Sequence, residues 1–167
     1  ALRVIRNATH THIHPYEKRL RQPFITLHAG EDFPHIISGL RSVDESVTFC
    51  DFRPNDRIGH GLALGISPKK WAERQQRSYI PLQEHLDNLV WLYHKGTQII
   101  AKDPRFHSAL VTVLEKIKYF CNELHQREYS PLSLYQAWLL RRNCPIKSFS
   151  DDNIIDQEIK LWAPDLS

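Results

Sequence analysis

The chain has 167 residues, enough for one domain with a hydrophobic core, and 22 lysine and arginine residues against 19 acidic ones leave a net charge of only +3. This mild charge, with no basic block, gives little reason to expect nucleic acid as a partner. Three cysteines without metal-like spacing favour a reducing compartment, and hence the cytoplasm. We expect no membrane span, because no apolar run approaches about 20 residues and no signal peptide is visible. The chain begins with Ala1 and has no methionine, so we expect it to be part of a larger protein.

The first segments are a weakly alternating stretch at residues 2–6, which predicts a strand, and a histidine-rich stretch after it. His10, His12 and His14 occupy every second position, so an extended backbone would place them on one face in a geometry that zinc accepts. The alternative is a polar, partly exposed loop without a metal. We favour the loop, for a reason of spacing given below.

A strand is predicted at Phe24-Ile-Thr-Leu-His-Ala-Gly-Glu-Asp32, which is rich in residues that favour β structure. Alternation divides its side chains between two faces, Phe24, Thr26 and His28 on one and Ile25 and Leu27 on the other. Gly30 allows a sharp turn and a close approach of the backbone to a ligand. His28 at the strand end suits a metal ligand, and Glu31 beyond the turn suits an acid–base group. Taken singly, a hydrogen-bonded core histidine and a solvated carboxylate are the simpler interpretations.

A second strand is predicted at residues 57–64, with His60 between two glycines. Apolar residues at helical spacing from Pro34 to about Phe49 predict a crossover helix, and residues 51–56 are rich in turn formers. Strand, helix and strand in this order are typical of a parallel βαβ unit. Because such a unit places both strand ends at one edge, we expect His28 and His60 to converge on one metal ion or water.

The rest of the chain predicts helices and no confident strand. They are expected at residues 68–77 with Trp71 as anchor, 82–96 closed by Gly96, 106–124 after Asp103-Pro104, 134–142 after Ser130-Pro131, and 153–162. Trp91 and Trp138 lie within these helical patterns and are expected in the core or between helices. The histidines of this region lack ligand spacing and are expected on the surface or in packing: His85, His94, His107 and His125.

The motifs His28-Ala-Gly-Glu31 and Arg57-Ile-Gly-His-Gly61 resemble those of the adenosine deaminase family, which belongs to the metal-dependent amidohydrolases. Gly39-Leu-Arg-Ser-Val-Asp-Glu45 and Ala63-Leu-Gly-Ile66 extend the likeness to large bacterial adenosine-deaminase-like proteins, including the deaminase component of an antiphage defence system. The resemblance covers about residues 24–66. Either motif alone is a weak signal, whereas both together in this order are a strong one.

The resemblance implies an α/β fold in which residues 1–66 form part of a parallel (β/α) TIM-type barrel and residues 67–167 form a mainly helical extension. A complete barrel typically needs about 250 residues, more than this chain has. It also implies a Zn²⁺ cofactor with His28 as metal ligand, Glu31 as donor to a purine ring nitrogen, His60 polarising the metal-bound water, and the Gly30 N–H contacting the base. The expected activity is hydrolytic deamination of adenosine or an adenine nucleotide by a cytoplasmic homo-oligomer.

The family's remaining metal ligands have no convincing counterpart in this sequence. The family carries a His-x-His pair several β/α units before the His-Ala-Gly-Glu strand, but His12 precedes His28 by too few residues for such units. Asp151 and Asp152 imitate the family's closing Asp-Asp pair, yet no apolar strand leads into them, and we expect them to cap the last helix. The missing ligands therefore lie outside this segment, or the site is inactive. Two alternatives stay open, an amidohydrolase for another ring and a non-catalytic scaffold subunit that retains the motifs.

Overall fold

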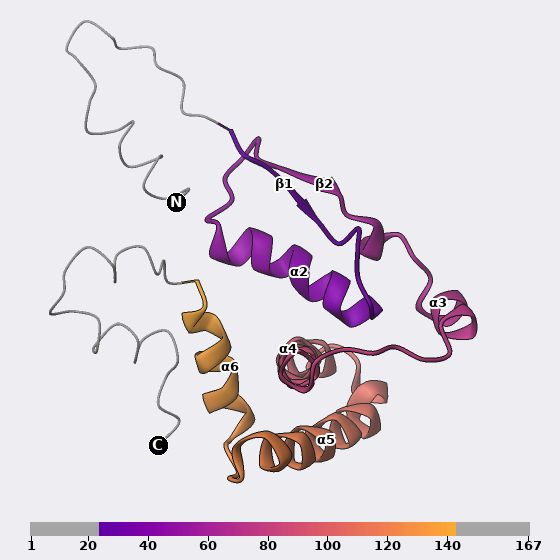
Figure 1. Cartoon of the computed structure of the whole chain (residues 1–167), viewed down its shortest axis with the longest axis vertical. Helices are drawn as coiled ribbons and strands as arrows, with labels where there is room; N and C mark the ends of the chain where they lie inside the picture. Colours follow the sequence, from indigo (N-terminus) through magenta and orange to yellow (C-terminus); the bar gives the residue numbers. More distant parts are fainter. Residues whose placement is uncertain (1–23, 143–167) are drawn as a thin grey trace, which may run out of the picture.

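The computed structural model describes residues 24–142, which form a small βαβ unit and a group of helices packed against it (Figure 1). Several sequence predictions lie outside the described residues. They are the strand at residues 2–6, the loop with His10, His12 and His14, and the last helix with Asp151 and Asp152.

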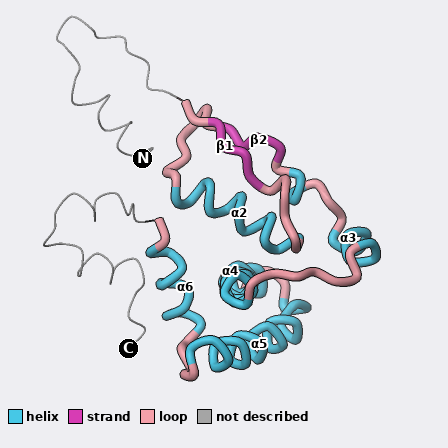
Figure 2. Tube along the Cα trace, in the orientation of Figure 1, coloured by secondary structure: helices cyan, strands magenta, loops and turns pink. Residues whose placement is uncertain are grey.

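The predicted parallel βαβ unit is confirmed. Strands β1 (Thr26–Ala29) and β2 (Arg57–His60) pair in parallel, and helix α2 (Ile36–Phe49) joins them. The chain is therefore mixed α/β, as Figure 2 shows, although most of the described residues are helical. Within residues 24–142 the sheet has two strands and no closed barrel is present, so the TIM-type barrel is not shown.

Helix α2 begins two residues later than Pro34 indicated. The imidazole of His35 accepts a hydrogen bond from the Ile37 N–H at 3.1 Å, so the side chain caps the helix and Pro34 lies before it. The apolar face of α2 follows the predicted spacing and turns Ile36 and Val43 inward. One face of the sheet is thereby covered, and Ile25, which directly precedes β1, is buried.

Strand β2 ends at His60, four residues earlier than expected. His60 and Gly61 adopt left-handed backbone conformations with φ of +64° and +59°, which an extended strand cannot continue through. The chain then forms the short 3₁₀ helix η1 (Leu62–Leu64). Of the strand predicted at residues 57–64, only Arg57–His60 is strand, and Leu62–Leu64 is the 3₁₀ helix.

The helices after the βαβ unit lie close to their predicted positions. They are α3 (Pro68–Arg74), α4 (Leu82–Ile100), the 3₁₀ helix η2 (Pro104–Phe106), α5 (His107–His125) and α6 (Pro131–Leu140). The side chain of Ser130 caps α6 as predicted, whereas Asp103 caps η2, which precedes α5, and not α5 itself. The expected end of α4 at Gly96 is wrong. Gly96 is a packing position, since a Cβ there would lie 2.4 Å from Cδ2 of Leu110 on α5.

The main core lies where α4 packs against α5 and α6. Its buried members are Leu86, Leu89, Val90, Ile117, Cys121 and Leu134. Burying each of the larger aliphatic side chains contributes roughly 1.5–3 kcal/mol, so this cluster is the main source of stability for the helical part. None of the helices within residues 24–142 combines the length and apolar character needed to cross a bilayer.

Polar contacts from tryptophans connect α2 to the later helices. Trp91 is buried and its Nε1–H donates to Asp44 at 2.8 Å, while the buried Trp138 donates to Glu45 at 2.9 Å. Both side chains therefore act as the predicted helix-interface anchors, and each also satisfies its polar nitrogen. The division of the chain at residue 66 stays a prediction, but these contacts join the two sides of it.

Candidate metal centre

His28, Glu31 and His60 come together at the carboxyl ends of the two strands. The rings of His28 and His60 lie 4.8 Å apart, and Glu31 lies between them, 3.5 Å from His28 Nδ1 and 2.9 Å from His60 Nε2. One possible ligand atom from each of the three residues lies within 4.8 Å of the others. The predicted convergence of the two histidines is therefore confirmed.

Backbone conformation after each strand brings Glu31 back toward the histidines. Gly30 has φ of +68°, a left-handed conformation that glycine adopts without strain. Its carbonyl accepts a hydrogen bond from Ala63 at 2.8 Å, and the Gly61 N–H donates to the Ala29 carbonyl at 3.1 Å. These two bonds join the turn after β1 to the turn after β2, so both sides of the centre are held in one arrangement.

His60 adopts the left-handed conformation without being glycine, at a cost of order 1–3 kcal/mol. Non-glycine residues in this region often mark functional sites, because the surrounding structure must compensate for the strain. Here the conformation directs the ring of His60 toward Glu31. An ordinary extended residue at this position would have carried the chain onward as strand.

Gly59 makes room for the ring of His28, a role that the sequence pattern did not reveal. The two residues are partners in the parallel register, and a Cβ at position 59 would lie 3.0 Å from Cδ2 and 3.2 Å from Nε2 of His28. Any side chain at this position would press on the imidazole. The only sequence signal was the glycine before His60, and its meaning depended on the register.

Asp56 fixes that register from the other end of the strands. Its carboxylate accepts hydrogen bonds from the Ile25 N–H at 2.9 Å and from the Arg53 N–H at 2.7 Å. The start of β1 is thereby attached to the turn that precedes β2. A shift by one residue would separate His28 from Gly59 and move His60 to the other face, so Asp56 positions the centre from a distance.

The donor set of the centre fits zinc chemistry, with two imidazoles and a carboxylate. Ligand atoms around a tetrahedral zinc lie roughly 3.3 Å apart, given bonds of about 2.0–2.1 Å. The 2.9 Å between His60 and Glu31 is instead a hydrogen-bond distance. The carboxylate of Glu31 is thus placed to form a hydrogen bond with the imidazole of His60.

The three side chains are accessible, with 63% of His28, 31% of Glu31 and 47% of His60 exposed. Substrate and further ligands could therefore approach from the open side. Exposed acidic groups also lie together in proteins that hold no metal, so the arrangement alone is not evidence of zinc.

No protein-family model matches this chain, and no curated protein matches its sequence. The likeness to adenosine deaminases therefore rests on the motifs quoted above.

Proposed function

We propose that this chain carries part of the catalytic centre of a zinc-dependent hydrolase that deaminates adenosine or an adenine nucleotide, as in antiphage adenosine-deaminase-like proteins. The observation that carries the proposal is the convergence of His28, Glu31 and His60 at one edge of a parallel strand pair. This edge, at the carboxyl ends of the strands, is where α/β folds hold their catalytic groups.

Each residue of the centre has a distinct role in this proposal. His28 holds the metal through a ring nitrogen, with Gly59 leaving space for the imidazole. Bound zinc would lower the pKa of its water to about 7 and so supply a nucleophile at neutral pH. Glu31 carries a proton to the ring nitrogen of the purine, and His60, 2.9 Å away, orients the water and shares that proton. The Gly30 N–H contacts the base.

The centre needs further donors to complete a tetrahedral shell. Within residues 24–142 the cluster of possible ligands consists of His28, Glu31 and His60, and two of these have other roles in the proposal. The remaining ligands would come from parts of the protein beyond the described residues. The activity is therefore assigned to the assembled protein, with this segment supplying the proton-transfer groups.

The decisive experiment replaces Glu31 with glutamine in the complete protein. Glutamine keeps the size and some hydrogen bonding but cannot transfer the proton, so ammonia release from adenosine or its nucleotides should fall by about 10²–10⁴-fold. Zinc content, measured by atomic absorption, should persist because Glu31 is not a ligand in the proposal.

The matched control is Glu115→Gln on the exposed side of α5, which should keep full activity. A Glu31→Gln protein as active as wild type would remove Glu31 from the mechanism. A zinc-loaded wild type that releases no ammonia from any adenine nucleoside or nucleotide would favour another amidohydrolase or a scaffold subunit.

A further inference from the structure

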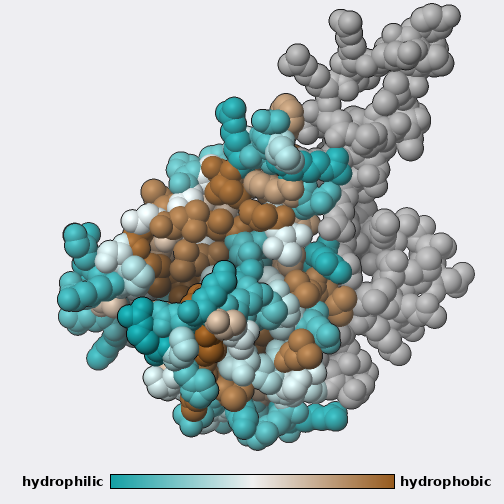
Figure 3. Space-filling view, turned by 180° about the vertical axis from the view of Figure 1, so that it is seen from behind, coloured by the Kyte–Doolittle hydropathy of each residue, from teal (hydrophilic) through white to brown (hydrophobic). Residues whose placement is uncertain are grey.

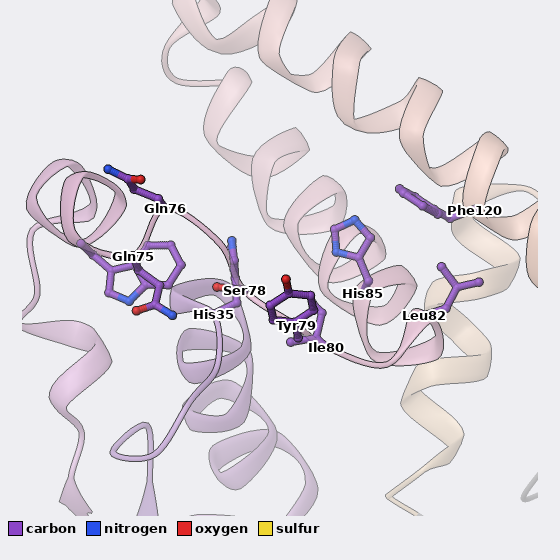
Figure 4. Close-up of a pocket in the computed structure, with 10 residues that line it drawn as sticks. His35, Gln75, Gln76, Ser78, Tyr79, Ile80, Leu82, His85 and Phe120 are labelled. Carbon is purple, nitrogen blue, oxygen red and sulfur yellow. The ribbon is translucent and has the colours of Figure 1, made fainter.

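A second site is indicated by a cavity of about 490 Å³ that lies apart from the metal centre. Residues of the segment between α3 and α4 line it together with His35 at the start of α2 and residues of α3, α4 and α5 (Figure 4). None of His28, Glu31 and His60 contributes to the lining. Its volume falls within the roughly 300–1,000 Å³ of sites for small organic molecules.

The lining is uncharged and rich in aromatic rings. It contains no lysine, arginine, aspartate or glutamate, so a phosphate or an ammonium ion would find no opposite charge among these residues. The rings of His35 and Trp71 meet edge to face at 4.8 Å, and those of His85 and Phe120 at 4.7 Å. Tyr79 is 86% exposed and lies between His35 and His85 in Figure 4. Flat aromatic ligands pack well against such surfaces.

The same lining offers hydrogen-bond donors and acceptors. The Oγ atom of Ser78 is buried without a hydrogen-bond partner among the described residues. Nδ1 of His35 accepts from the Ile37 N–H, which in the neutral ring leaves Nε2–H as a donor. Burial lowers the pKa of His35, so its ring stays neutral more readily than in water. Gln75 and Gln76 add side-chain amides.

A buried hydroxyl without a partner is costly, and a ligand that offers it a hydrogen bond would recover that cost. A purely apolar ligand would leave the buried hydroxyl of Ser78 without a partner. An ionised ligand would gain no counter-charge from the residues of the lining. A neutral ring with polar atoms on its edge offers Ser78 a hydrogen bond and needs no counter-charge.

We propose that this cavity binds an uncharged, planar nitrogen heterocycle of the nucleobase class, at a site separate from the metal centre. The ring packs among Trp71, Tyr79 and His85, and its edge exchanges hydrogen bonds with Ser78 and the glutamine amides. This site does not depend on the proposed deaminase activity, because the two sets of residues do not overlap.

The test titrates adenine into the full chain by isothermal calorimetry, after a chelator has removed divalent metals. One adenine should bind per chain. Ser78→Ala should weaken binding roughly three- to tenfold through the lost hydrogen bond, and His85→Ala about tenfold through the lost ring contact. The matched controls Ser108→Ala and His107→Ala change exposed residues at the start of α5 and should bind like wild type.

Glu31 is proposed to contact a purine ring at the metal centre, so Glu31→Gln removes any adenine bound there. The adenine binding that His85→Ala weakens should persist in the Glu31→Gln protein. The proposal is overturned if metal-free protein binds no adenine. It is also overturned if Glu31→Gln abolishes binding while His85→Ala does not, since the adenine would then lie at the metal centre. Neither result would decide whether the zinc-loaded protein deaminates adenosine, so the two proposals fail separately.

Discussion

At the scale of single residues, the candidate centre depends on backbone conformations as much as on its functional side chains. Glu31 approaches the histidines because Gly30 turns left-handed, and His60 faces Glu31 because it adopts a similar conformation at some cost. The paired strands bring His28 and His60 to one edge of the sheet. Gly59 leaves the small space that the ring of His28 occupies.

Gly59→Ala therefore tests the arrangement without removing any functional group. The new Cβ would lie 3.0–3.3 Å from ring atoms of His28, so the exposed imidazole must shift by a few tenths of an ångström. Misplacement by about 1 Å at a catalytic centre can cost on the order of 10²-fold in rate, so for this smaller shift we expect a loss of roughly three- to tenfold. The fall in kcat/KM for ammonia release is the measurement.

The control for this substitution is Gly65→Ala. A Cβ at position 65 meets no atom closer than 3.8 Å, and its φ of −98° is ordinary. It should leave activity and unfolding free energy nearly unchanged. If Gly59→Ala and Gly65→Ala changed kcat/KM equally, the space around His28 would have no role in the activity.

The residues of the centre could be found from sequence, because His28, Glu31 and His60 belong to motifs at strand ends. The residues that position them could not. Gly59 and Asp56 matter only through the register, which pairs His28 with Gly59 and connects Asp56 to Ile25. A short strand carries no sequence mark of its register, because that depends on a partner far along the chain.

At the scale of elements, helix existence was predicted well and helix ends less well. Caps such as Ser130 act locally, so a sequence pattern reveals them. Gly96 suggested a helix end, yet α4 continues to Ile100 because the glycine accommodates Leu110 from another helix. Tertiary packing decided this position against local propensity.

Gly39 in α2 allows a similar test of packing against propensity. Helix propensity alone predicts that Gly39→Ala stabilises α2 by about 1 kcal/mol. A Cβ there would lie 2.7 Å from the ring of Phe33 and 2.8 Å from Cβ of Ala63, which cannot rotate away. We expect a net destabilisation of about 1–3 kcal/mol by urea denaturation.

The exposed position Thr48 on the same helix provides the comparison, since Thr48→Ala should change stability by less than about 0.5 kcal/mol. If Gly39→Ala proved more stable than wild type, the close packing of α2 on η1 would be wrong.

At the scale of the whole molecule, buried charges join α2, α4 and α6. Asp87 on α4 receives two hydrogen bonds from Arg141, which follows α6, and lies near Arg41 of α2. Burial raises the pKa of Asp87, while the two guanidinium groups act in the opposite direction. At pH values above the pKa that Asp87 has in the folded protein, its ionised carboxylate therefore lowers the free energy of unfolding. The two arginines make this loss smaller.

Arg141→Met should destabilise the protein by about 1–3 kcal/mol at pH 7. Loss of the guanidinium raises the pKa of Asp87 further, so folding is penalised more whenever the carboxylate is ionised. The penalty shrinks as pH falls toward the unfolded value near 3.8, since protonated Asp87 needs no counter-charge. Urea denaturation at pH 7.5 and pH 5 measures this difference.

Arg142→Met changes the exposed neighbouring arginine and should have little effect at either pH. A loss for Arg141→Met that is equal at both pH values would contradict the role assigned to Asp87, because packing alone carries no such dependence.

Among residues 24–142, helix α2 covers one face of the strand pair, whereas parallel sheets are normally covered on both faces. Large apolar side chains before β1 and after β2 are exposed within these residues: Phe24 by 60%, Leu62 by 54%, Leu64 by 66% and Ile66 by 36%. Apolar surface also gathers over the upper part of the molecule in Figure 3. Such patches mark interaction surfaces, and in the homo-oligomer that the resemblance implies we expect a second copy of the chain to cover this one.

The double substitution Leu62→Ser and Leu64→Ser should therefore shift the chain from oligomer to monomer in sedimentation velocity runs over a range of concentrations. The two leucines are exposed in the single chain, so each monomer should keep its fold and its helical circular dichroism. Val111→Ser with Tyr119→Ser, on exposed positions of α5, removes comparable apolar surface elsewhere and should leave association unchanged. Identical sedimentation of the Leu62/Leu64 variant and wild type would show that copies of this chain do not meet through the sheet.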